Sequence, residues 1–177
     1  YGMFCKHVAR LLGQPGDGHG DFVCAMSQGT SGDLMWMDYG SPKKTITCDS
    51  YAEEVAAYAK RALNTVKYHD HVPLAMVEKT LALKYRVPDE KRLAWARPVA
   101  AKIKDDLPKD KTEVYAKEAL ILHERQKTSL KLQAIRIGDL TVTTLPNEVY
   151  ALTGLKLKAQ APLGMHFNVE LANGAEG

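Results

Sequence analysis

Residues 130–148 read LKLQAIRIGDLTVTTLPNE and carry the clearest structural pattern in the chain. Apolar and polar residues alternate through the first half of this stretch, which is typical of a strand with one buried face. The turn pair Gly138–Asp139 follows, and a second apolar run, residues 140–145, comes directly after it. A glycine-containing pair between two such runs favours a hairpin. The stretch therefore predicts two neighbouring strands that end in a polar turn.

Helical and strand patterns mix in the rest of the chain. The helical patterns cover residues 2–12, 50–67, 89–103, 112–126 and 147–157. The strand patterns cover residues 22–27, 73–86 and 167–171, and the first of these is expected to be buried. Several strands are neighbours along the chain instead of alternating with helices. We therefore expect an α+β fold, with layered mixed β-sheets and helices packed on the outside.

Capping residues predict where three of the helices begin. Ser50 and Glu53 have the spacing of a capping box, in which each side chain satisfies a free backbone donor of the other. Asp89 and Asn147 each stand directly before a helical pattern, as N-cap residues do.

Composition excludes several classes of function. The 177 residues suit a single domain by length, and 45% of them are hydrophobic, as in globular proteins. The net charge is +3 and no run of about five or six like charges occurs, which argues against a nucleic-acid partner. No apolar stretch reaches the roughly 18 residues of a spanning helix. Three cysteines without C-x-x-C spacing predict neither a disulfide framework nor a zinc knuckle.

Two further motifs are weak. The glycine-rich loop GQPGDGHGD, residues 13–21, precedes a strand pattern instead of a helix, which argues against dinucleotide binding. His69 and His71 flank Asp70, and on a strand both imidazoles would share one face and could hold a metal ion. The same residues lie between a helix end and a proline, where polar residues collect in any protein.

Two polar turns that carry an acid follow strand patterns: SQGTSGD, residues 27–33, and TTLPNE, residues 143–148. Functional groups are often held at such strand ends. Each acid also has a simpler interpretation. Asp33 could bond its own backbone in the turn, and Glu148 could be a first-turn acid favoured by the helix dipole. The pattern alone leaves both interpretations open.

Three segments resemble, in the same order, segments of the neutral (non-lysosomal) ceramidase family, and are most similar to its bacterial homologues of unassigned substrate. They are SQGTSGDLMWMDYG, residues 27–40, IGDLTVTTLPNEVYALTG, residues 137–154, and ELANGAEG, residues 170–177. The resemblance implies that residues 1–177 are an internal piece of the catalytic domain. The N-terminal part and any C-terminal immunoglobulin-like domain would then lie outside this chain.

The resemblance implies a zinc site. Members of the family are zinc amidases that split ceramide into sphingosine and a fatty acid. Their zinc is held by two histidines, a glutamate in a Pro-Gly-Glu turn and a tyrosine. The turn here reads Pro146-Asn147-Glu148, so Glu148 is the expected Zn²⁺ ligand. The histidines are expected before Tyr1 and the tyrosine just past Gly177. With one ligand of four, the 177 residues alone should bind zinc weakly and be inactive.

The catalytic serine of the family is replaced. Its Gly-Asp-Val-Ser-Pro-Asn motif aligns with residues 32–37, so Gly32 and Asp33 match while Met35 stands in the serine's place. A thioether neither attacks a carbonyl nor donates a proton. Asp33 would orient the backbone turn or a metal-bound water, and Ser31 is the nearest hydroxyl that could act instead. The loop is expected to line one cleft with Glu148.

These inferences predict a zinc-dependent hydrolase of an amide or acyl bond. Zinc would polarise the carbonyl and activate a water, so the mechanism tolerates the loss of the serine. The alternative is a non-catalytic homologue that keeps the fold to bind a lipid or glycan. The expected substrate is a small-molecule or lipid amide, with peripheral membrane contact possible in the full-length protein. The resemblance suggests a secreted or periplasmic location.

Overall fold

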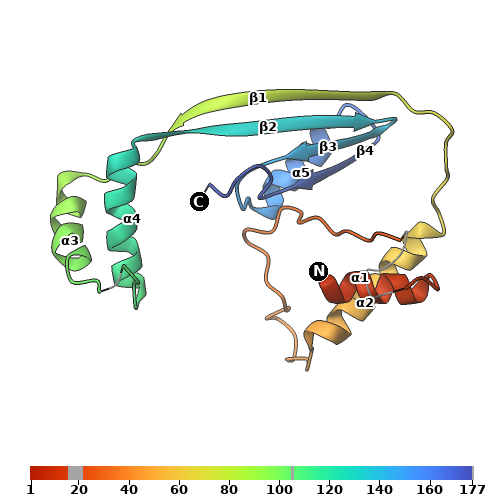
Figure 1. Ribbon diagram of the computed structural model, residues 1–177, viewed down its shortest axis with the longest axis horizontal. Helices are drawn as coiled ribbons and strands as arrows, with labels where there is room; N and C mark the ends of the chain where they lie inside the picture. The colour runs from red at the N-terminus through yellow and green to blue at the C-terminus, as the bar shows by residue number, and fades with distance from the viewer. Residues whose placement is uncertain (16–21, 105, 177) are drawn as a thin grey trace. The chain divides into compact units, whose positions relative to one another are not determined.

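The computed structural model describes residues 1–15, 22–104 and 106–176. Within these residues, helices and strands are both present, and the α+β prediction is confirmed (Figure 1). In chain order the elements are α1 (Gly2–Leu11), α2 (Cys48–Leu63), β1 (Leu74–Lys84), α3 (Glu90–Ala100), α4 (Lys111–Arg125), β2 (Lys127–Ile137), β3 (Leu140–Thr144), α5 (Ala151–Gln160) and β4 (Met165–Val169).

The strands form one sheet in the order β1-β2-β3-β4. Strands β2 and β3 pair antiparallel with Ile137 opposite Leu140, so the predicted hairpin about Gly138 and Asp139 is confirmed. Gly138 adopts a positive φ of 62°, a conformation that favours glycine. Strand β4 pairs with β3 in parallel, and the connection between them contains α5. The sheet is therefore mixed, as the sequence predicts.

The chain divides into two compact units, of which the second is residues 78–132. Its core lies between α3 and α4, where Ala96, Ala116 and Ala119 are buried. Small side chains at these positions let the two helices approach closely. The predicted cap at Asp89 is confirmed, because its carboxylate accepts a hydrogen bond from the Arg92 amide at 2.8 Å.

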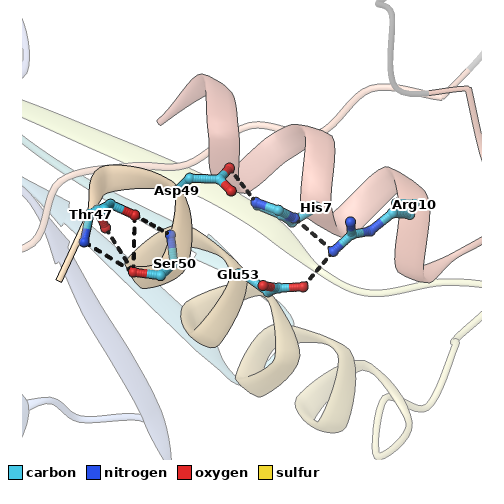
Figure 2. A network of polar contacts seen from close by, with 6 residues as sticks. All are labelled: His7, Arg10, Thr47, Asp49, Ser50 and Glu53. Carbon is cyan, nitrogen blue, oxygen red and sulfur yellow. Dashed lines mark hydrogen bonds and ion pairs between the residues drawn. The ribbon is translucent and has the colours of Figure 1, made fainter. Parts of the chain in front are cut away.

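The first unit comprises residues 1–77 and 133–177 and contains α1 and α2. A polar network joins these two helices (Figure 2). His7 is buried, and its Nε2 lies 2.9 Å from an Asp49 oxygen. Arg10 donates to His7 Nδ1 at 3.0 Å and to Glu53 at 2.6 Å. Since Arg10 can only donate, neutral His7 carries its proton on Nε2 and donates it to Asp49.

The start of α2 corrects a prediction. The N-cap is Thr47, whose hydroxyl accepts from the Ser50 amide at 3.1 Å, while Ser50 Oγ accepts from the Thr47 amide at 3.0 Å (Figure 2). Ser50 is thus the third helical residue and not the cap, and Glu53 bonds Arg10 instead of closing a capping box. A serine can occupy either the N-cap or the third helical position of a capping box, so the sequence alone does not fix its place. The Glu53 carboxylate accepts a hydrogen bond from Arg10 of α1 instead.

The predicted strand at residues 22–27 is wrong, because these residues are in no strand. Phe22 and Cys24 line a cavity of about 440 Å³ together with Phe4 and Val8 of α1 and Ala59 of α2. The expected burial is also wrong for most of the run, because Phe22 and Cys24 are half-buried whereas Val23 is 84% exposed. The glycine-rich loop lies largely outside the described residues.

Candidate functional site

The loop that follows residues 22–27 lies against both the end of β4 and the turn before α5. The Glu170 amide donates to the Gln28 carbonyl at 3.0 Å, and the Gly32 amide donates to the Val149 carbonyl at 2.8 Å. The expected proximity of residues 29–33 to Glu148 is therefore present.

Gly32 makes the closest approach to this turn. A Cβ atom at residue 32 would overlap the Glu148 carbonyl oxygen, and it would lie 3.1 Å from the Val149 carbonyl carbon. These are backbone atoms that cannot rotate away. The backbone at residue 32 can therefore approach the Glu148 turn this closely only because glycine has no side chain.

Asp33 caps helix α5 from a distant part of the chain. Its Oδ1 accepts a hydrogen bond from the Ala151 amide at 2.7 Å. The N-cap residue of α5 is Tyr150, whose side chain makes no capping bond. The free donors at a helix start need an acceptor, and here the loop supplies it. The expected role of Asp33 is to orient either the backbone of its own turn or a metal-bound water. Its hydrogen bond instead orients the backbone of α5, which is a different segment.

The start of α5 also corrects the predicted role of Asn147. The helix begins at Ala151, four residues beyond Asn147, so this asparagine is not its cap. Its side-chain amide donates instead to the Glu176 carbonyl at 2.5 Å. The Glu176 amide in turn donates to the Pro146 carbonyl at 2.9 Å. The turn before Glu148 is therefore fixed by the segment that follows β4.

Glu148 lies in the connection between β3 and α5 and is exposed. Within the described residues, no group donates a hydrogen bond to its carboxylate. A carboxylate on an exposed residue is a suitable oxygen ligand for Zn²⁺. The chemistry of Glu148 fits the expected metal, although no group of three histidine, cysteine, aspartate or glutamate side chains meets in the described part of the chain.

Glu170 is the site residue that sequence reasoning missed. It follows β4 directly and only 2% of its surface is exposed. One oxygen accepts from Ser31 Oγ at 2.5 Å, and the other accepts from the amides of Ser31 at 3.2 Å and Val149 at 3.1 Å. The sequence does contain a signal for it. Glu170 lies within the strand pattern at residues 167–171, and an acid that is buried in a strand needs hydrogen-bond partners.

The Ser31 hydroxyl makes hydrogen bonds to two side chains. Its hydroxyl donates to Glu170 and accepts from the Gln28 side-chain amide at 2.6 Å. A carboxylate does stand within reach of this hydroxyl, which is the geometry that a serine nucleophile would need. A nucleophilic role for Ser31 stays a prediction.

The other candidate residues lie apart from these contacts. Met35 is 68% exposed. His69 and His71 are exposed and precede β1. The metal-binding hypothesis requires both imidazoles to lie on one face of a strand, and residues 69–71 are in no strand.

A second polar cluster lies on β3 and β4. Asn168 is buried, and its amide donates to Thr143 Oγ1 at 2.5 Å and lies 3.1 Å from His166 Nε2. Burial, and then the positive charge of Lys158, lower the pKa of His166 below its ordinary value of 6.5. The Thr143 hydroxyl also lies 3.3 Å from His166 Nε2, whereas the buried Nδ1 has no hydrogen-bond partner among the described residues.

Together, the fold and these contacts define an α+β protein with one mixed sheet, in which three segments distant in sequence meet beside Glu148. A scan of protein-family models and searches of curated proteins and of solved structures find no match to this chain. None of the helices in the described ranges has both the length and the apolar character needed to cross a bilayer.

Proposed function

We propose that the protein containing this chain is a zinc-dependent hydrolase of an amide or related acyl bond, similar to the neutral ceramidases. The observation that supports the proposal is the meeting of the three resembling segments. Residues 28–33, the turn at 146–149 and the segment from Glu170 to Glu176 are joined by backbone and side-chain hydrogen bonds. The resemblance requires the loop and the turn that carries Glu148 to lie in one site, and this contact agrees with that requirement.

Glu148 is the residue of this chain that would hold the zinc ion, with further ligands expected outside residues 1–177. When bound, zinc supplies Lewis acidity, which polarises the scissile carbonyl and makes a water more acidic. The exposed Glu148 carboxylate is free to serve as a ligand, because its turn is held by its neighbours and not by its own side chain.

The remaining residues shape the surroundings of Glu148. Gly32 brings the loop into contact with the turn, and Asp33 holds the first free amide of α5. Ser31 keeps its hydroxyl directed at Glu170. The substrate class that follows from the resemblance is a lipid or small-molecule amide, and peripheral membrane contact belongs to the same proposal.

The second candidate function is non-catalytic binding of a lipid or glycan. Met35 in the place of the family serine favours it, because the side chain offers neither a nucleophile nor a proton donor. The two functions differ in their need for metal, since a binding protein does not require a complete zinc site.

Zinc content of the intact protein is the deciding measurement. We expect purified protein to carry one zinc ion per chain and Glu148→Ala to lose most of it. Glu54→Ala is the matched control, because Glu54 is an exposed glutamate on α2. Full zinc content in Glu148→Ala would reject the ligand assignment. Absence of zinc from the wild-type protein would favour the binding function.

A further inference from the structure

Glu170 is the only acidic side chain that is buried in the described part of the chain, with 2% of its surface exposed. Removing a carboxylate from water is costly unless hydrogen bonds replace the lost hydration. A buried acid at this position therefore needs donors, and the fold has to supply them from other segments.

The donors come from two segments that are distant in sequence. Ser31 offers its hydroxyl and its amide, and Val149 offers its amide. One carboxylate oxygen receives the hydroxyl and the other receives both amides. Hydrogen bonds to a charged acceptor are stronger than those between neutral groups.

The positions of these donors connect Glu170 to the proposed site. Ser31 directly precedes Gly32 and Asp33, and Val149 directly follows Glu148. We propose that Glu170 is a positioning residue, whose carboxylate holds the loop at residues 28–33 against the turn that carries Glu148. It acts through these neighbours, because both of its oxygens are occupied by protein donors.

The first test is amide hydrogen exchange of the intact protein. Glu170→Ala removes the acceptor of the Ser31 and Val149 amides, so their exchange should become on the order of 10- to 100-fold faster. Glu170→Gln keeps one acceptor oxygen and should have a smaller effect. Ser31→Ala removes only the hydroxyl contact, so both amides should continue to exchange slowly.

The matched control for Glu170→Gln is Glu54→Gln, which changes an exposed glutamate and should leave both amides as in the wild type. Should Glu170→Ala fail to fold, Glu170→Gln carries the test. Wild-type exchange at Ser31 and Val149 in the Glu170 variants would overturn the proposal.

The second readout is zinc affinity, which rests on the proposed function. Residues that orient a metal ligand typically change affinity by about 10- to 100-fold when mutated, so Glu170→Gln should weaken zinc binding by at least about tenfold. Faster exchange with unchanged zinc affinity would overturn a positioning role towards Glu148. If the wild-type protein binds no zinc, the proposed function fails, while the exchange experiment still decides whether Glu170 holds the loop.

Discussion

The carboxylate of Asp33 accepts a hydrogen bond from the amide of Ala151 at 2.7 Å, and 118 residues separate the two in sequence. Helix α5 thus takes its N-terminal cap from a remote loop. The bond couples the formation of the helix to the docking of that loop beside Glu148.

Asp33→Ala should destabilise the intact protein by about 1 kcal/mol, the usual contribution of an N-cap. Asp33→Asn keeps an acceptor oxygen and should recover most of the loss. Urea denaturation of the three proteins measures the difference. Equal stability of Asp33→Ala and wild type would show that the Ala151 amide finds another acceptor.

Gly32→Ala should be far more damaging than Gly29→Ala. A methyl group at residue 32 would overlap the Glu148 carbonyl, whereas the nearest atom to one at residue 29 is the Asn168 carbonyl oxygen at 3.9 Å. We expect Gly32→Ala to cost about 1–3 kcal/mol of unfolding free energy. Thermal denaturation of both variants tests this, and similar behaviour of the pair would mean that the loop does not contact the turn in solution.

Gly154→Ala should also destabilise the protein, although alanine is normally favoured over glycine inside a helix by about 1 kcal/mol. The added methyl group would overlap the side chain of Thr30. Thr30→Ala removes the overlapping hydroxyl and methyl groups, so the double variant should be more stable than Gly154→Ala alone. A double-mutant cycle measures this coupling, and strict additivity would contradict the contact.

His166 should make the protein less stable in mild acid. Its pKa is lowered in the folded state by burial and by Lys158. The unfolded chain therefore binds a proton first as the pH falls through about 6.5, and stability present above that pH is progressively lost below it. The loss of urea resistance between about pH 7.5 and 5.5 should be smaller in His166→Gln. An identical pH dependence in the two proteins would exclude this residue as the cause.

Cys24 should react slowly with alkylating reagents. Burial raises the pKa of its thiol, and a hydrogen bond and charge interaction with Cys5 raise it further. Because the thiolate is the reactive form, Cys24 should be modified more slowly than the exposed Cys48. Cys5→Ala should speed the reaction at Cys24, as followed by mass spectrometry of peptides. Unchanged reactivity of Cys24 in that variant would show that Cys5 has no influence on it.

Local sequence patterns determined several elements of this protein. The alternation before Gly138 and Asp139 predicted the hairpin of β2 and β3, and Asp89 marked the start of α3. These features depend on residues close together in the chain, where side-chain periodicity and capping chemistry act directly. Fold class follows from the same short-range information.

Tertiary structure decided the features that join distant residues. The cap of α5 is Asp33 and not the nearby Asn147. Phe22 and Cys24 line a cavity beside α1 instead of belonging to a strand. Glu170 is buried because Ser31, 139 residues before it, supplies two of its donors. A buried charge or a free helix amide requires a partner, but the sequence does not state which segment provides it. Only the folded chain, which brings those segments within hydrogen-bond distance, selects the partner.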